Sequence, residues 1–186
     1  MSLLENFDGV IGDLFIETGT NTGNTLDLAR KHFARCLSIE QGAAMYVNAS
    51  LRFSEDKKVV VLCGDSPVIL RTIIEDVPTT FWLDAHYFEN GDTLAPSGKQ
   101  CPLLDELRVI TAFPWTQPHM ILIDDAYMFD DSIPHPGSIH PFWTSNESNH
   151  AAYNRSHWPK IEEIDAVLAG YEKSMRENCV LQYKKA

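Results

Sequence analysis

The stretch Leu14-Phe15-Ile16-Glu17-Thr18-Gly19-Thr20-Asn21-Thr22-Gly23-Asn24-Thr25 constrains the fold of this chain more than any other. It is typical of a short buried strand followed by an acidic residue, a glycine-containing turn and the start of a helix. Such a turn brings backbone N–H groups and a helix N-terminus close to a ligand. Gly19 and Gly23 permit a tight turn and a close approach of the backbone. The stretch therefore predicts a cofactor site at the end of the first strand.

The spacing of the glycines separates two classes of cofactor. The pattern is Glu17-x-Gly19-x-x-x-Gly23, and Asn21 stands where the second glycine of a dinucleotide fingerprint would be. Glu17 also places a negative charge where the pyrophosphate of a dinucleotide would lie. A cofactor with a cationic centre and no phosphate suits that charge better. An NAD-binding oxidoreductase is therefore the less favoured alternative.

Length and composition indicate one globular domain. The chain has 186 residues, of which 44% are hydrophobic and 22% charged. We expect a single domain over residues 1–186, with residues 1–13 as a short N-terminal extension. Met1–Asn6 lacks the basic start and apolar core of a signal peptide, and no apolar run is long enough to span a membrane. A cytoplasmic location is therefore expected.

The charge of the chain restricts its partners. A net charge of −11 argues against a nucleic acid or an anionic membrane as the main partner. Three of the four cysteines lie in apolar, strand-like runs, which favours reduced thiols in the core. The oligomeric state stays open, with a homodimer as one alternative.

Strand and helix patterns alternate along the chain, which predicts an α/β fold. We expect a single doubly wound, mostly parallel seven-stranded sheet with helices on both faces and a C-terminal antiparallel hairpin. The apolar run over 59–63 is typical of a strand buried on both faces. The predicted strands cover 14–17, 37–40, 59–63, 79–84, 120–124, 171–176 and 179–184. The predicted helices cover 21–34 with Asn21 or Thr22 as cap, 41–53, 66–74 with Ser66 as cap, 102–113 and 158–168.

Each of the first five predicted strands ends in or runs into an acidic residue. In open α/β sheets, ligands bind beyond the carboxyl ends of the strands, so these residues predict an anionic rim around a cleft. Glu40 lies 23 residues after Glu17, close to the position where an acidic residue binds ribose hydroxyls; the alternative is a charge favoured by a helix dipole. Asp65 could accept from an adenine amino group or cap the next helix. The rim consists of Glu17, Glu40, Asp65, Asp84 and the pair Asp124-Asp125.

With these residues in place, the sequence resembles the Rossmann-like S-adenosylmethionine-dependent methyltransferases, from Leu14 to the C-terminus. The motif that carries the resemblance is the acidic residue followed by Gly-x-x-x-Gly. The resemblance implies that Glu17, Gly19 and Gly23 surround the methionine moiety and that Glu40 binds the ribose. It implies Asp65 and Ser66 near the adenine. Further residues assigned to the cofactor site are Thr18, Asn24, Thr25, Gln41 and Asp84.

A narrower resemblance concerns the small-molecule O-methyltransferases of sugar and natural-product pathways. It rests on the segments Phe81–His86, Cys101–Leu107 and Ile123–Asp125. In metal-dependent members, an Asp after strand four and an acidic pair after strand five hold a divalent cation. This implies a Mg²⁺ site of Asp84, Asp124 and Asp125, since Mg²⁺ prefers oxygen ligands. The alternative for the pair Asp124-Asp125 is one carboxylate at the cofactor edge and one helix cap.

His86 follows Asp84 by two residues and leaves three readings open. It could be a metal ligand, a general base working without metal, or a loop histidine bonded to backbone. We assign the catalytic centre to Asp84 first and His86 second. The segment 126–158 is a long loop in which Phe142, Trp143 and Tyr153 could line an acceptor pocket or anchor the loop.

The expected function is transfer of a methyl group from S-adenosylmethionine to a hydroxyl of a small molecule, with a sugar as one such acceptor. A divalent metal such as Mg²⁺ is expected to assist. The alternatives are a non-catalytic or degenerate module that binds the cofactor, and the less favoured NAD-binding oxidoreductase. Cofactor binding without turnover across a broad panel of hydroxyl acceptors would favour the first alternative.

Overall fold

The computed structural model describes residues 7, 9–87, 98–133, 155–176 and 179–185. Its centre is a seven-stranded sheet in the order β3-β2-β1-β4-β5-β7-β6. The first five strands run parallel, β7 is antiparallel to β5, and β6 is antiparallel to β7. The strands are β1 (Leu14–Thr18), β2 (Arg35–Glu40), β3 (Val59–Cys63), β4 (Thr79–Leu83), β5 (His119–Ile123), β6 (Glu172–Arg176) and β7 (Val180–Lys185). The predicted fold class is confirmed.

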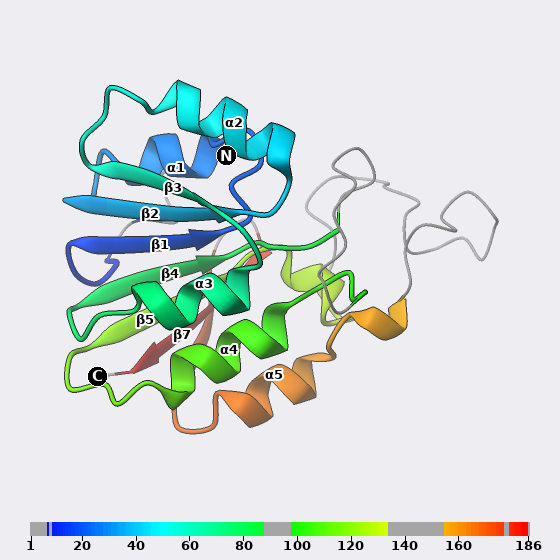
Figure 1. The fold of residues 1–186 in the computed structure, drawn as a ribbon. Coiled ribbons are helices and arrows are strands. Elements are labelled where there is room, and N and C mark those ends of the chain that lie inside the picture. The colour runs from blue at the N-terminus through cyan, green and yellow to red at the C-terminus, as the bar shows by residue number, and fades with distance from the viewer. Residues whose placement is uncertain (1–6, 8, 88–97, 134–154, 177–178, 186) are drawn as a thin grey trace.

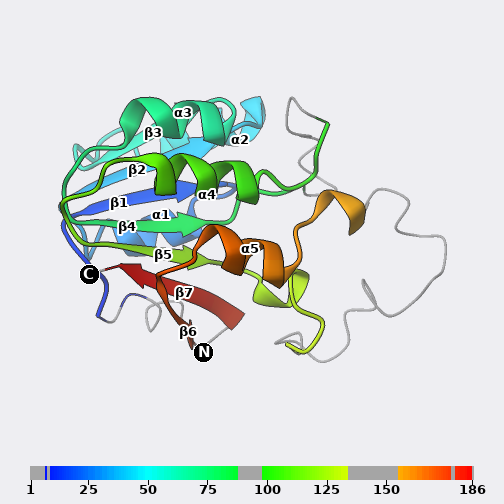
Figure 2. The same ribbon diagram turned by 90° about the horizontal axis from the view of Figure 1, so that it is seen from below.

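Helices cover both faces of this sheet (Figure 1). On one face, α3, α4 and α5 lie side by side, while α1 and α2 lie on the opposite side, as Figure 2 also shows. The helices are α1 (Asn24–Ala29), α2 (Ala43–Arg52), α3 (Ser66–Ile73), α4 (Leu103–Ala112) and α5 (Ile161–Val167), with short 3₁₀ turns η2 (Ala126–Met128) and η3 (Arg155–His157). Among the described residues, no helix is long and apolar enough to cross a bilayer.

The alternation of side chains along the central strands separates two apolar cores. Leu14 and Ile16 of β1 point to the core beneath α3, α4 and α5, together with Leu70, Leu107 and Ile164 of those helices. The intervening Phe15 points to the other core, where it packs with Leu26 of α1 and with Phe33, Phe53 and Trp82. Because successive strand residues face opposite sides, a strand between two helix layers is apolar on both.

Two details of the prediction are wrong for local reasons. The run 59–63 is not buried on both faces, because β3 is an edge strand: Val60 is 45% exposed and the Cys63 thiol is exposed as well. The first helix does not cover 21–34. The helix covers only Asn24–Ala29. Asn21 and Gly23 both have positive φ, so the helix cannot begin before Asn24.

Helix capping also differs from the prediction. Gly23 occupies the N-cap of α1, in place of Asn21 or Thr22. Asp65 occupies the N-cap of α3, in place of Ser66, which is the first helical residue. Neither cap makes a side-chain hydrogen bond to the helix backbone. The Ser66 hydroxyl is thereby available for a contact outside its own helix.

Candidate cofactor and reaction site

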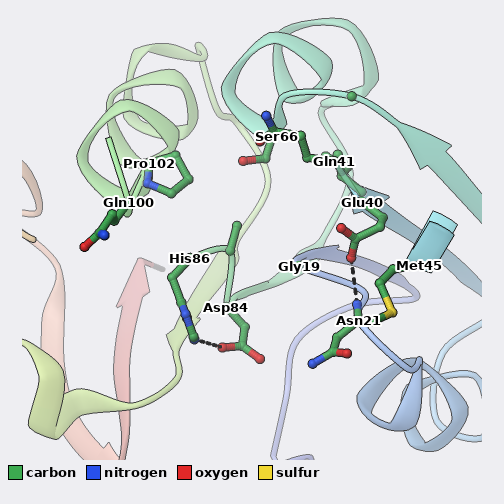
Figure 3. A pocket seen from close by; sticks show the side chains of 13 residues that line it. Gly19, Asn21, Glu40, Gln41, Met45, Ser66, Asp84, His86, Gln100 and Pro102 are labelled. Carbon is green, nitrogen blue, oxygen red and sulfur yellow. Dashed lines mark hydrogen bonds and ion pairs between the residues drawn. The ribbon is translucent and has the colours of Figure 1, made fainter. Parts of the chain in front are cut away.

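A cleft of about 790 Å³, solvent-open space included, lies at the carboxyl edge of the parallel strands. It is built from the segments that follow β1, β2, β3 and β4, together with the residues preceding α4 (Figure 3). The predicted residues that line it are Gly19, Glu40, Gln41, Ser66, Asp84 and His86; the other lining residues are Asn21, Ile39, Met45, Gly64, Ala85, Gln100 and Pro102.

Gly19 forms the floor of the turn that begins the cleft. Its φ of 82° is left-handed, and a Cβ at this position would lie 2.6 Å from the carbonyl oxygen of Asp84. Its N–H donates to the carbonyl of Ile39 at 2.9 Å, which ties the turn to the end of β2. Gly19 is required both for its backbone conformation and for the close approach of the segment after β4. The glycine therefore joins three strand ends into one rim.

Gly23 has a different role from the predicted one. Its φ is 78°, and a Cβ there would lie 2.7 Å from the ring of Phe53, which belongs to the apolar core. Gly23 does not line the cleft, nor do the predicted Asn24 and Thr25. Asn24 instead accepts a hydrogen bond from Arg52 at 3.1 Å. This half of the motif packs α1 and α2 together.

Glu17 lies beneath the turn and does not reach the cleft. Its side chain is 1% exposed, and the Ser38 hydroxyl donates to its carboxyl group. Ser38 in turn lies 2.5 Å from the hydroxyl of Thr20. Burial raises the pKa of Glu17 well above its usual value, because it penalises the charged form more than the Ser38 bond favours it. The buried Thr18 is likewise absent from the cleft lining.

Glu40 presents a fixed carboxylate to the cleft. One carboxylate oxygen accepts from the N–H of Asn21 and the other from the N–H of Gly42, each at 2.7 Å. The side chain is 8% exposed and lines the cleft, where its bond to Asn21 is drawn in Figure 3. Each oxygen keeps a further lone pair. Glu40 can therefore accept from two neighbouring hydroxyls while staying locked in place.

Asp65 is not a lining residue of the cleft; the next residue, Ser66, is. Burial and the charge of Asp105 raise the pKa of Asp65. The Ser66 hydroxyl donates to Glu106 of α4. Of the two residues predicted near an adenine, the structure therefore brings only Ser66 to the cleft.

Asp84 and His86 line the end of the cleft next to Gly19, and together with Asp125 beside them they form a cluster. Nε2 of His86 lies 3.5 Å from an oxygen of Asp84 and 3.5 Å from an oxygen of Asp125. Nδ1 lies 2.9 Å from the carbonyl oxygen of Tyr87 and so carries a proton, because a carbonyl can only accept. The ring is also packed against Trp158, with centroids 5.2 Å apart.

The charges in this cluster shift one another's titration. Burial lowers the pKa of His86, but Asp125 and Asp84 raise it by more, so the net pKa lies well above its usual value. Burial raises the pKa of Asp84, and the bond to His86 lowers it in part. Burial, followed by the charges of Asp84 and Asp125, raises the pKa of Asp124 well above its usual value. These shifts favour a positive charge between the carboxylates or a proton on one of them.

The predicted metal set of Asp84, Asp124 and Asp125 differs from the set that the structure brings together. Among the described residues, ligand atoms of Asp84, His86 and Asp125 lie within 4.8 Å of one another. Asp124 accepts the backbone N–H of Asp125 at 2.8 Å. Asp125 has a left-handed φ of 53°, a conformation that Asp tolerates and that recurs at functional sites.

The donor set fits a divalent cation. The Nδ1–H bond to Tyr87 leaves Nε2 facing the two carboxylates, which is how second-shell contacts orient a metal-binding histidine. One imidazole beside two carboxylates departs from the all-oxygen set that Mg²⁺ prefers, and an imidazole ligand suits transition ions such as Zn²⁺ or Fe²⁺. A second proton on His86 would satisfy the same two carboxylates without metal.

Glu106 is a buried residue of the site that the sequence reasoning missed. It is 1% exposed on α4, and burial raises its pKa to about 7, although the hydrogen bond from Ser66 lowers it. The signal was present: Glu106 shares the buried face of α4 with Leu103, Leu107 and Ile110, at helical spacing. A carboxyl at an apolar position of an amphipathic helix loses hydration free energy on burial and needs a hydrogen-bond partner.

The predicted loop residues Phe142, Trp143 and Tyr153 lie outside the described residues.

Comparison with known proteins supports the fold. A putative caffeoyl-CoA O-methyltransferase from Staphylococcus aureus is 12% identical, with a TM-score of 0.61 over 93% of this chain and 75% of that one. The Podospora anserina methyltransferase PaMTH1, bound to S-adenosylhomocysteine, gives 0.59 at 14% identity over 92% and 70%. This chain has the fold of the S-adenosylmethionine-dependent methyltransferases. The predicted resemblance is thereby confirmed at the level of the fold.

Other solved methyltransferases with this fold act on different substrates. CalS10 from Micromonospora echinaspora, an amino pentose methyltransferase with bound S-adenosylmethionine, gives a TM-score of 0.54 at 14% identity over 94% of this chain and 84% of that one. A geranyl diphosphate C-methyltransferase is also among the matches. No protein-family model and no curated protein matches the sequence.

Proposed function

We propose that this protein transfers the methyl group of S-adenosylmethionine to a hydroxyl of a small molecule. The observation that carries the proposal is the adjacency of two features in one cleft. One is a set of groups suited to an adenosyl cofactor, Gly19, Glu40 and Ser66. The other is the cluster of Asp84, His86 and Asp125 beside Gly19. The solved methyltransferases of this fold include O-methyltransferases and an amino pentose methyltransferase, which supports a hydroxyl of a sugar-like acceptor.

Each lining residue has a place along the cofactor. Glu40 accepts from the two ribose hydroxyls, because both of its oxygens are fixed by backbone N–H groups and keep free lone pairs. Gly19 permits the methionine portion to approach the backbone of the turn. The anionic cluster beyond Gly19 stabilises the positive sulfonium. Holding the sulfonium methyl in line with the acceptor oxygen lowers the entropic part of the barrier.

Asp84 is the residue we assign to the acceptor proton. Its carboxylate lines the cleft, and burial raises its pKa, which makes it a stronger base than an exposed aspartate. His86, with protons on both ring nitrogens, is a poor base near neutral pH and serves as the cation that holds Asp84 and Asp125 in place. The oxygen of the acceptor hydroxyl attacks the methyl group while the hydroxyl proton passes to Asp84. The bond from the methyl carbon to the sulfonium sulfur breaks, and the sulfur leaves as a neutral thioether.

Asp84, His86 and Asp125 would also be the residues that hold a divalent cation. Such an ion would lower the pKa of a bound acceptor hydroxyl. In that state His86 is neutral at Nε2, with its proton on Nδ1 and donated to Tyr87. The predicted Mg²⁺ assistance stays part of the proposal, with a transition ion as the alternative that the histidine ligand favours.

Calorimetry with S-adenosylhomocysteine is the first test. We expect binding in the micromolar range, and no binding of this ligand would contradict the whole proposal. Turnover is then measured with labelled S-adenosylmethionine over a panel of sugars, phenols and alcohols. Binding without turnover across the panel would support the non-catalytic alternative, and transfer to carbon would remove the hydroxyl assignment.

The metal question is tested separately with EDTA and with a pair of variants. Activity that is lost in EDTA and restored by Mn²⁺ or Mg²⁺ would support a cation. Asp125→Asn is then expected to impair the restored activity strongly. Asp124→Asn is the matched comparison, because an amide oxygen can still accept the N–H of Asp125. The reverse order of the two variants would favour the predicted set that contains Asp124.

A further inference from the structure

Ser66 and Glu106 form a pair that connects the cleft to the interior of the protein. Ser66 is the first residue of α3, is 7% exposed and lines the cleft. Glu106 lies on the neighbouring helix α4 and is 1% exposed. The Ser66 hydroxyl donates to one carboxyl oxygen of Glu106. The buried Glu106 therefore determines how the Ser66 hydroxyl is oriented in the wall of the cleft.

The direction of this hydrogen bond limits what Ser66 can do in the cleft. A serine hydroxyl has one proton to donate and two lone pairs that accept. When Glu106 is ionised and accepts this proton, the Ser66 oxygen faces the cleft as an acceptor only. A serine without such a partner would rotate and serve a donor or an acceptor equally well. Glu106 thus converts an adaptable hydroxyl into a selective one.

The position of Ser66 identifies the part of the ligand that it meets, and this step rests on the proposed function. The strand order β3-β2-β1-β4 places the end of β2, with Glu40, between the segment after β3 that carries Ser66 and the segments after β1 and β4 that carry Gly19 and Asp84. If Glu40 holds the ribose and the methyl group points toward Asp84, the base of the cofactor lies on the Ser66 side. Gly64 and Pro102 line the cleft near Ser66 without a side-chain donor, whereas Gln41, labelled beside Ser66 in Figure 3, carries an amide group.

We propose that Glu106 is a positioning residue that makes the site selective for a base with an exocyclic amino group. The amino group of adenine donates to Ser66, whereas the carbonyl oxygen of hypoxanthine would face the lone pairs of Ser66. Two facing acceptors leave both without a hydrogen bond in a partly desolvated site, which is costly.

The burial of Glu106 is an independent observation that points the same way. Its second oxygen has no hydrogen-bond partner among the described residues, although the side chain lies inside the protein. A buried carboxyl with an unpaired oxygen destabilises the fold relative to an apolar residue of similar size. The apolar neighbours Leu103, Leu107 and Ile110 on the same helix would accommodate such a residue readily. A recognition role accounts for a carboxyl at this position.

The test compares two ligands by calorimetry at pH 8, where Glu106 is ionised: S-adenosylhomocysteine, and S-inosylhomocysteine, which carries hypoxanthine. We expect the wild-type protein to prefer the adenine ligand by about tenfold or more, from the loss of one hydrogen bond and the acceptor–acceptor contact. Hypoxanthine also carries a proton on N1, which other groups of the site can sense. The contribution of Ser66 is therefore measured as the change in the ratio of the two affinities between the wild-type protein and its variants.

Glu106→Met removes the acceptor of Ser66 and keeps the length of the side chain. It is expected to reduce the preference by about tenfold, because the freed hydroxyl can donate to the hypoxanthine carbonyl. Glu106→Gln is the matched control: its amide oxygen can still accept from Ser66, so the preference is expected to remain. Ser66→Ala should lose the same part of the preference as Glu106→Met and decides the matter if the latter does not fold.

The outcomes separate this inference from the proposed function. If the wild-type protein binds S-adenosylhomocysteine but the preference for adenine over hypoxanthine is unchanged in Glu106→Met or in Ser66→Ala, Glu106 does not determine which base the site selects. If the wild-type protein binds neither ligand, the proposed function itself fails and the inference falls with it. A merely structural role of Glu106 would weaken both ligands equally and would leave their ratio unchanged.

Discussion

Replacing Glu106 by glutamine should change how the stability of the protein depends on pH. Glu106 is 1% exposed, and burial raises its pKa from 4.5 to about 7. Between these two values the unfolded chain has released the proton while the folded protein retains it. The folded state therefore binds more protons, and the free energy of unfolding falls as the pH rises through this window. Below it, Glu106 is protonated in both states and contributes no pH dependence.

The size of the effect follows from the width of the window. Each unit of difference in pKa corresponds to about 1.4 kcal/mol, so the full window between 4.5 and about 7 amounts to about 3 kcal/mol. Because a chain with a net charge of −11 approaches neutrality in acid and becomes less soluble, a practical range begins near pH 5.5. From there to pH 8, the wild-type protein should lose about 2 kcal/mol relative to Glu106→Gln.

Urea unfolding of the two proteins at several pH values at constant ionic strength measures this difference. Contributions from Glu17 and Asp124, whose pKa values are also raised by burial, cancel in the comparison to first order. Glu172→Gln on the exposed edge strand β6 controls for the exchange of an acid for an amide. A difference between Glu106→Gln and wild type that stays constant within about 0.5 kcal/mol over this range would refute the reasoning.

Three further outcomes follow from the geometry. Gly19→Ala should destabilise the protein by roughly 1–3 kcal/mol and abolish detectable binding of S-adenosylhomocysteine, since a Cβ would lie 2.6 Å from the Asp84 carbonyl oxygen; thermal unfolding and calorimetry test this, and near-wild-type binding would contradict it. Glu40→Gln places an NH₂ group against one of two backbone N–H donors and should weaken binding of S-adenosylhomocysteine about tenfold or more. Unchanged affinity in calorimetry would mean that Glu40 does not contact the ribose. Arg35→Ala breaks an exposed ion pair with Glu75 and should cost less than about 1 kcal/mol in urea unfolding, a larger loss being unexpected.

The fold was accessible from the sequence because its signals are local and repeat along the chain. Alternating strands and helices predict a parallel sheet with covered faces, and the turn around Gly19 marks its first crossover. The buried state of β3 was not accessible, since the run Val59–Cys63 has the same apolar pattern whether it lies at the centre or at the edge. Strand order is a long-range property, and here it decides that Val60 and Cys63 are exposed.

The candidate site was predictable where a residue follows a strand and projects into the cleft, as Glu40, Asp84 and His86 do. It was not predictable where the side chain turns back into the protein. Glu17 bonds to Ser38 of the neighbouring strand, and Asp124 accepts the N–H of the next residue. Such choices depend on backbone geometry, which spacing alone does not reveal.

The two measurements on Glu106 are stronger together than either is alone. A buried carboxyl that only fills space should be replaceable by Met with a gain in stability above neutral pH and no change in ligand preference. A carboxyl that orients Ser66 should show the same gain in stability together with a loss of preference for adenine. Because stability and recognition then move in opposite directions, no general loosening of the fold could produce the result. The pair of readouts therefore distinguishes a residue retained for the ligand from one tolerated by the core.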